Sequence, residues 1–435
     1  MTRYDDALPQ FAALVKELMG QEAVYDHLFL RDAAGKLTFI TLKHVPEDDI
    51  ARLCERAKKL IPWVERDSPV AKLEHLFDES LSDPAAASPE LINHQDFHGW
   101  VRVVERRIVG QDWLRAPLTP IPDAPPVVVF ASQKGGVGRS TALAVAANAL
   151  SQQGRNLLVL DLDLEAPGLG GMLLSELPSY GTLDYFVEAG ASEIDGKFLD
   201  DLIAPSRLAG PGLIHVAPAV GQVGNANPQN VLGKIARAYV EKVDPDGKTV
   251  SFLDQTRELV RRLCERYRYD AVFVDARAGL NEATAASILG LGAEILLFGV
   301  DTPQTFVSYR YFLAHLARFR PERSDEDDWR YRFRMVQGKA QADPEAHARF
   351  RTQTFDLFSD TLYDTEEGID EEAFNFDYDD STAPHYAWPI LNDTNYAEFD
   401  PLAKNEQFAF HLYDRTFGPF IAALCDKIGL KNETL

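Results

Sequence analysis

The chain has 435 residues, of which 46% are hydrophobic and 26% charged, a composition typical of a globular protein large enough for two domains. Its net charge of −23 argues against a protein that binds nucleic acid through a broad basic surface. No apolar run reaches membrane-spanning length, and the N-terminus lacks the pattern of a signal peptide. Cys54, Cys264 and Cys425 lie far apart, so we expect reduced thiols and a cytoplasmic location.

Residues 1–117 are expected to form a smaller α+β domain of unknown role. Residues 27–31 and 37–42 suit two strands of a hairpin. Residues 48–61 carry apolar side chains on one helical face, and residues 100–113 also show an apolar spacing typical of a helix. No catalytic pattern is evident in this region.

A proline-rich stretch, residues 118–126, predicts a stiff, extended linker ahead of residues 127–435. In the larger region, apolar strand-like runs alternate with helix-like segments. The predicted strands are residues 127–131, 156–161, 213–218, 269–275, 294–300 and 331–337. This alternation predicts an α/β fold with a mostly parallel, doubly wound sheet.

The most informative stretch joins the first of these strands to a helix through a glycine-rich turn. The turn reads Ser-Gln-Lys-Gly-Gly-Val-Gly-Arg-Ser-Thr over residues 132–141, and residues 141–150 suit the helix. Glycines let backbone N–H groups close around an anion, and a helix N-terminus adds partial positive charge. The pattern therefore predicts a phosphate-binding loop, although Gln133 and Arg139 depart from the usual P-loop pattern G-x-x-x-x-G-K-[ST].

Two later strands end in carboxylates. Asp161 and Asp163 end the second strand two residues apart, which places them on the same side of an extended chain. Asp275 ends the strand at 269–275. Because ligands of open α/β sheets bind beyond the carboxyl ends of the strands, Asp161 and Asp163 are expected to face a phosphate-bound Mg²⁺.

Together the glycine loop, the Asp-Leu-Asp segment and the strand ending in Asp275 resemble the ParA/MinD family of P-loop ATPases. The loop resembles the family's deviant Walker A motif, with Lys134 at the position of the signature lysine and Arg139 in place of the usual second lysine. The resemblance implies a P-loop NTPase fold, binding of ATP with Mg²⁺, and a homodimer with the nucleotide sandwiched between its subunits.

The resemblance also implies roles for individual residues. The implied nucleotide-binding residues are Gly135, Gly136, Val137, Gly138, Arg139, Ser140 and Thr141, and the implied metal-binding residues are Ser140, Asp161 and Asp275. The implied catalytic residues are Lys134, which would act on the partner's phosphates, Asp163, which would position water, and Arg139, which would contact phosphate oxygens. Because arginine and lysine are not interchangeable, we expect nucleotide binding with slow hydrolysis.

Residues 352–403 contain no lysine or arginine, and acidic and aromatic residues interleave there. This pattern predicts an acidic insertion that packs on the ATPase or binds a partner. We expect a protein partner to contact this insertion or residues 1–117. The sequence also resembles ATPases that are fused to other modules in bacterial signalling or defence gene clusters.

Two alternatives stay open at this point. The first is a partition-type ATPase that acts on DNA, which the acidic composition disfavours. The second is a scaffold that binds nucleotide without hydrolysing it. A membrane-bound role like that of MinD is disfavoured, because residues 426–435 are too short and polar for an amphipathic membrane helix.

Overall fold

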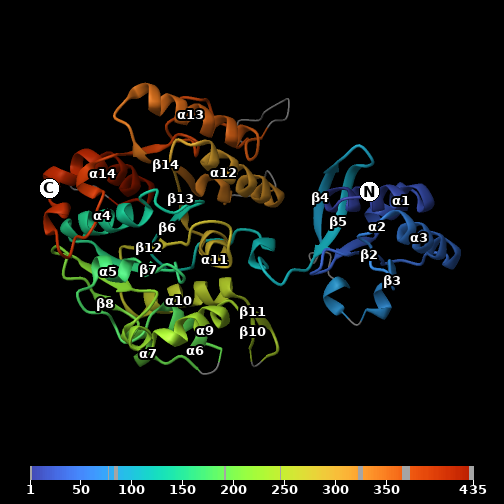
Figure 1. The fold of residues 1–435 in the computed structure, drawn as a ribbon, viewed down its shortest axis with the longest axis horizontal. Helices are drawn as coiled ribbons and strands as arrows, with labels where there is room; N and C mark the ends of the chain where they lie inside the picture. Colours follow the sequence, from blue (N-terminus) through green and yellow to red (C-terminus); the bar gives the residue numbers. More distant parts are fainter. Residues whose placement is uncertain are drawn as a thin grey trace. The chain divides into compact units, whose positions relative to one another are not determined.

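The computed structural model describes residues 2–76, 78–82, 87–190, 193–244, 246–321, 327–364 and 373–430. The chain divides into two compact units, Met1–Leu114 and Arg115–Leu435 (Figure 1). The boundary follows Leu114 rather than residue 117, and the proline-rich stretch belongs to the second unit.

The first unit is an α+β structure with a five-stranded sheet in the order β3-β2-β1-β5-β4. Its strands are β1 (Leu28–Arg31), β2 (Leu37–Thr41), β3 (Val70–Lys72), β4 (Ser88–Asn93) and β5 (His98–Glu105). Its helices are α1 (Tyr4–Met19), α2 (Gln21–Asp26) and α3 (Glu47–Leu60), with 3-10 helices at Leu73–His75, Glu79–Ser82 and Asp112–Leu114. Phe11 of α1 contacts Phe29 and Phe39 edge to face in the core between helices and sheet.

The prediction of a helix over residues 100–113 is wrong, because most of this stretch belongs to strand β5 and the turn after it. Strand β5 pairs antiparallel with β4 and parallel with β1. Val101 and Val103 are buried while Trp100 is 51% exposed, which is the alternation of a strand with one solvated face. The spacing of apolar residues alone did not distinguish a helical repeat from a strand repeat. The β-branched valines in this stretch favour a strand.

The second unit is built on an eight-stranded sheet in the order β15-β14-β13-β6-β12-β7-β9-β8. All of its neighbouring strands are parallel except β8 and β9, which confirms the mostly parallel sheet. Its strands are β6 (Val127–Ser132), β7 (Asn156–Asp161), β8 (Ala204–Pro205), β9 (Leu213–Ala217), β12 (Ala271–Asp275), β13 (Glu294–Gly299), β14 (Phe333–Ala340) and β15 (Trp388–Leu391). A separate ribbon pairs β10 (Lys242–Val243) with β11 (Thr249–Val250).

Helices cover both faces of this sheet, as a doubly wound fold requires (Figure 1). They are α4 (Arg139–Gln152), α5 (Leu169–Leu173), α6 (Thr182–Glu188), α7 (Gly196–Asp200), α8 (Gln222–Ala226), α9 (Pro228–Ala238), α10 (Phe252–Arg266), α11 (Glu282–Gly290), α12 (Pro303–Leu316), α13 (Pro344–Ser359) and α14 (Phe410–Lys427). Short 3-10 helices lie at Ala317–Phe319, Trp329–Arg332, Thr394–Tyr396 and Asn405–Phe408. In the described ranges, no helix is both long enough and apolar enough to cross a membrane.

One hydrophobic core cluster lies between the sheet and helices α4 and α14. Phe130 of β6 contacts Phe273 of β12, Phe298 of β13 and Phe420 of α14, so one aromatic cluster ties the central strands to the last helix. Because strands β6, β7, β12 and β13 are buried on both faces, their sequences are almost unbroken apolar runs.

The proline-rich stretch runs along the second unit instead of spanning open solvent. The backbone N–H of Leu118 donates to the carbonyl of Leu289 at 2.7 Å, and Arg332 Nη1 donates to the Leu118 carbonyl at 2.7 Å. Arg257 Nη1 donates to the carbonyl of Thr119 at 2.9 Å. These bonds fix the stretch to the helices and strands of the second unit.

The expected acidic insertion at 352–403 begins within α13, and residues 365–372 lie outside the described residues. After these residues, the chain packs over the side chain of Arg334 in β14. The Arg334 guanidinium donates hydrogen bonds to the backbone carbonyls of Ser381, Thr382, Ala383 and Tyr386. Burial lowers the pKa of Arg334 to about 10. The described part of the segment is therefore packed on the sheet edge, and strand β15 extends the sheet from it.

Candidate functional site: a phosphate loop with a buried arginine

The loop after β6 forms an open cradle at the carboxyl end of the central strands. Gly136 and Gly138 have φ angles of 77° and 91°, a left-handed conformation that only glycine adopts without strain. A Cβ added to Gly135, Gly136 or Gly138 would meet no heavy atom within 4 Å, so the loop faces open space. Helix α4 begins at Arg139, and Thr141 lies in its first turn. Backbone N–H groups and the start of a long helix make this cradle suited to phosphate.

Strand β14 supports the loop from the other side. A Cβ on Gly338 would lie 2.2 Å from the carbonyl oxygen of Val137, so only glycine allows this close approach. The Val137 side chain is buried, which anchors the loop on the sheet.

Arg139 lies inside the protein, and its side chain is only 8% exposed. Its Nε donates to Asp275, its Nη2 donates to Asp163 Oδ2 at 3.2 Å, and its Nη1 donates to Ser132 Oγ at 3.3 Å. Burial opposes the charge, but the carboxylates of Asp275 and Asp163 outweigh it and raise the pKa of Arg139. The guanidinium is thus the counter-ion of two carboxylates, and its contact with phosphate stays a prediction.

Ser140 and Asp275, both assigned to a metal from the sequence, contact one another directly. Ser140 Oγ donates to Asp275 Oδ2 at 2.6 Å, while Arg139 occupies Oδ1. Burial raises the pKa of Asp275, and Arg139 and Ser140 lower it in part.

Asp161 closes the loop that follows β7. Its Oδ1 accepts the backbone N–H of Asp163 at 3.1 Å, and its Oδ2 accepts those of Gly168 and Leu169, each at 3.1 Å. Burial, followed by repulsion from Asp275, raises the pKa of Asp161 to about 7. Both oxygens already accept hydrogen bonds, so the metal role of Asp161 stays a prediction.

Two carboxylate oxygens near the loop are buried and have no hydrogen-bond partner among the described residues. They are Asp163 Oδ1 and Glu165 Oε2. The other oxygen of Glu165 accepts from Arg277 and, at 3.1 Å, from the hydroxyl of Tyr239. Buried polar atoms are usually paired, so Asp163 Oδ1 fits a site that receives a cation or a water molecule.

The donor set suits magnesium held partly by a nucleotide. In the described part of the chain, no cluster of three or more His, Cys, Asp or Glu side chains could hold a metal ion. Magnesium in nucleotide sites keeps several waters and takes one or two protein ligands together with phosphate oxygens. Ser140 Oγ and one carboxylate beside it are enough for such a site.

Lys134 lies on the exposed side of the loop, away from the buried carboxylates. Its Nζ donates to Gln304 Oε1, at the start of α12, at 3.0 Å. Sequence reasoning missed Gln304 and Ser132, for which no pattern gave a signal. It also missed Glu165, which the Asp-Leu-Asp-Leu-Glu segment contains and which links two loops of the site.

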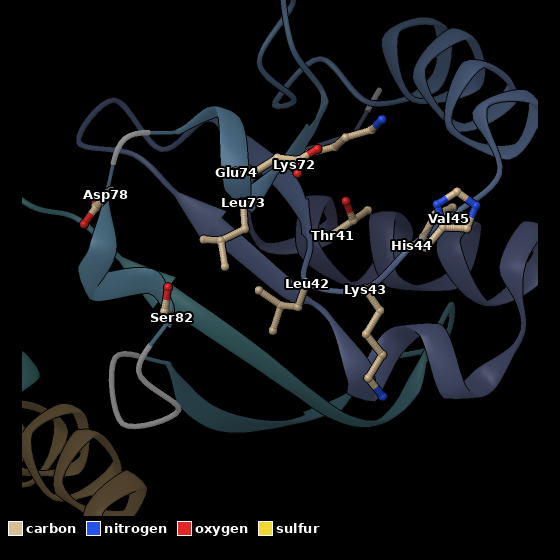
Figure 2. Close-up of a pocket in the computed structure, with 10 residues that line it drawn as sticks. All are labelled: Thr41, Leu42, Lys43, His44, Val45, Lys72, Leu73, Glu74, Asp78 and Ser82. Atoms are coloured by element: carbon tan, nitrogen blue, oxygen red, sulfur yellow. The ribbon is translucent and has the colours of Figure 1, made fainter.

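A separate cavity of about 650 Å³ lies in the first unit (Figure 2). Leu42 and Leu73 line it with apolar side chains. Its two lysines have partners, since Lys43 pairs with Asp26 and Lys72 pairs with Glu47. Both lysines are therefore neutralised by carboxylates, and we assign no chemistry to the cavity.

Residues 128–285, which contain the glycine loop, Asp161, Asp163, Glu165 and Asp275, match the family model described as the CobQ/CobB/MinD/ParA nucleotide binding domain. They form a ParA/MinD-like nucleotide-binding domain. The resemblance seen in the motifs is thereby confirmed for this segment of the second unit. No curated protein matches the sequence.

Three solved structures are among those similar to the chain. A McdA–ATP complex from Cyanothece is 12% identical, with 72% of this chain and 99% of that chain covered and a TM-score of 0.45. A ParA family ATPase from Chlorobium tepidum TLS is 16% identical, with 68% and 99% covered and a TM-score of 0.44. The MinD cell division protein of Aquifex aeolicus is 14% identical, with 71% and 99% covered and a TM-score of 0.42.

Proposed function

We propose that this chain is an ATP-dependent molecular switch that binds ATP with Mg²⁺ at residues 134–141, hydrolyses it slowly and dimerises around it. The observation that carries the proposal is the open glycine cradle of the ParA/MinD-like domain, with buried carboxylates beside it. Glycine N–H groups and the N-terminus of α4 would hold the phosphates.

The residues present fit a magnesium ion. Ser140 Oγ would be a protein ligand, and Asp275, which accepts its hydrogen bond, and Asp163 would supply negative charge. Bound magnesium would neutralise charge on the phosphoryl oxygens. Asp163 has one unpartnered buried oxygen, which is suited to accept a hydrogen bond from an attacking water.

Dimerisation is proposed from the placement of Lys134. Its ammonium group lies on the open side of the loop and donates to the amide oxygen of Gln304. A flexible cation at an exposed position can reach the phosphates of a second copy, where it would stabilise charge during transfer much as an arginine finger does.

The partner is proposed to be a protein that contacts the first unit. Leu91 and Trp100 are cross-strand neighbours on β4 and β5, and each is 51% exposed. Ile108 and Val109, in the turn after β5, are 86% and 78% exposed. The exposed apolar pair of Leu91 and Trp100 favours a protein contact, and Ile108 and Val109 add exposed apolar surface to the same unit.

Light scattering tests the proposal directly. The molar mass of the full-length protein is measured without nucleotide, with ADP and with Mg²⁺-ATP, and phosphate release is measured in parallel. We expect a dimer with ATP and slow release of phosphate. A mass that ignores nucleotide, with no phosphate released, would favour a constitutive scaffold. ATP-dependent binding to nonspecific duplex DNA that weakens with salt would favour a partition ATPase instead.

A further inference from the structure

The guanidinium of Arg139 and a divalent cation have the same potential partners in this site. Arg139 contacts one oxygen of Asp275 and one oxygen of Asp163, and Ser140 takes the second oxygen of Asp275. The side chains of Arg139 and Asp275 are 8% and 3% exposed, so water screens their attraction poorly. Only Asp163 Oδ1 is left without a hydrogen-bond partner among these carboxylate oxygens.

Arginine is suited to this role in a way that lysine is not. Its planar fork has donors on three nitrogens, and here each nitrogen contacts a different side chain, those of Asp275, Asp163 and Ser132. A lysine ammonium is a single point charge and cannot span both carboxylates with the same set of bonds. The departure from lysine at this loop position therefore gives the carboxylates a built-in counter-ion.

We propose that Arg139 acts as an internal counter-cation that competes with divalent metal for Asp163 and Asp275. In the nucleotide-free protein it neutralises both carboxylates and keeps their affinity for metal low. Phosphate oxygens at the cradle offer the guanidinium other partners, so nucleotide binding releases the carboxylates, and metal and nucleotide binding become coupled. The inference rests on the proposed function for the identity of the cation.

Binding of Mn²⁺ to the nucleotide-free, full-length protein tests the competition, with free Mn²⁺ followed by electron paramagnetic resonance. We expect weak binding to the wild type and binding at least about tenfold tighter to Arg139→Gln, because the glutamine leaves two buried carboxylates without a cation. In the double variant Arg139→Gln with Asp163→Asn, we expect the affinity to return to the wild-type value. A gain that persists in the double variant would show that Asp163 is not a carboxylate that Arg139 withholds from the metal, and it would overturn the inference.

Arg334→Gln is a matched control, because Arg334 is also buried in the second unit but, among the described residues, its guanidinium donates its hydrogen bonds to backbone carbonyls and not to carboxylates. It should be destabilised without any gain in Mn²⁺ affinity. Thermal melting gives a second readout: Mn²⁺ should raise the melting temperature of Arg139→Gln and leave that of Arg334→Gln unchanged.

If Arg139→Gln does not fold, Arg139→Lys decides the question. This variant keeps the positive charge but lacks the planar guanidinium that contacts both carboxylates. We therefore expect Mn²⁺ to bind to it about threefold tighter than to the wild type. Equal affinity in the wild type and in the folded variant would overturn the inference. Nucleotide binding by the wild type is measured alongside. If the wild type binds ATP but the Arg139 variant gains no Mn²⁺ affinity, only the counter-cation role is contradicted. If the Arg139 variant gains Mn²⁺ affinity but the wild type does not bind ATP, only the proposed function is contradicted.

Discussion

Asp161 and Asp275 stand at paired positions on the adjacent parallel strands β7 and β12, yet their carboxylates have different partners. The Asp161 carboxylate accepts three backbone N–H bonds, whereas, among the described residues, the Asp275 carboxylate accepts only from the side chains of Arg139 and Ser140. The Asp161 carboxylate therefore fixes a loop, and the Asp275 carboxylate binds side chains of the glycine loop and of the helix that follows it. This division explains why the two acids should respond differently to mutation and to pH.

Asp161 should make the protein less stable as pH rises from about 4 to about 7. Its folded-state pKa of about 7 lies above the value of about 3.9 expected when unfolded, so the folded state binds the extra proton in this window. The contribution to the slope is at most about 1.4 kcal/mol per pH unit. We expect Asp161→Asn to remove this component from urea unfolding free energies measured between pH 5 and 8. An unchanged slope would contradict the assignment.

His385 should act in the opposite direction. Its imidazole is fully buried against the hydroxyl of Tyr363, and burial lowers its pKa, so the unfolded state binds protons more readily near pH 6. Stability is therefore lost as pH falls below about 6.5. His385→Gln should flatten this acid-side loss in denaturant melts, while the exposed His411→Gln should not. Equal curves for the wild type and the His385 variant would contradict the prediction.

The glycine loop allows a matched pair of substitutions. A methyl group on Gly135 or Gly136 enters open space in both cases, but only Gly136 has a positive φ. Gly136→Ala should lower the free energy of unfolding by about 1 kcal/mol through backbone strain, and Gly135→Ala should have little effect. Chemical denaturation without nucleotide measures both. Equal destabilisation by the two substitutions would show that strain at Gly136 is not the cause.

Lys134→Ala separates hydrolysis from binding. Because Lys134 lies outside the buried ion-pair cluster and contacts Gln304, its loss should leave stability and ATP affinity nearly unchanged. Phosphate release should slow at least tenfold, about 1.4 kcal/mol in the barrier, and the ATP-dependent mass increase should be lost. Gln304→Ala is the control for the local contact and should keep both. A Lys134 variant that releases phosphate at the wild-type rate would remove the proposed role in trans.

The sheet and the loop could be predicted because their signals are local. Strands β6, β7 and β12 are short apolar runs that end in the polar residues Ser132, Asp161 and Asp275, since each is buried on both faces and stops at the site. Residues 100–113 were misread because apolar spacing over a short stretch fits a strand that is half exposed as well as a helix.

The partners of Arg139 could not be predicted from the sequence. Asp275 lies far along the chain from Arg139, and only the order of β6 and β12 in the sheet brings the two together. The sequence suggested that the arginine contacts phosphate, because a loop side chain is expected to face the ligand. Its burial against two acids depends on packing between strands that no local pattern encodes.

Amide hydrogen exchange tests the central claim, that the loop at residues 132–141 binds nucleotide, most directly. Peptides that cover residues 132–141 and 161–169 are followed in the full-length protein with and without Mg²⁺-ATP. We predict slower exchange in both peptides with ATP, and no change in those peptides for a Gly138→Trp variant whose side chain fills the cradle. Unchanged exchange in the wild type at millimolar ATP, or protection elsewhere in the chain alone, would contradict a nucleotide site at this loop.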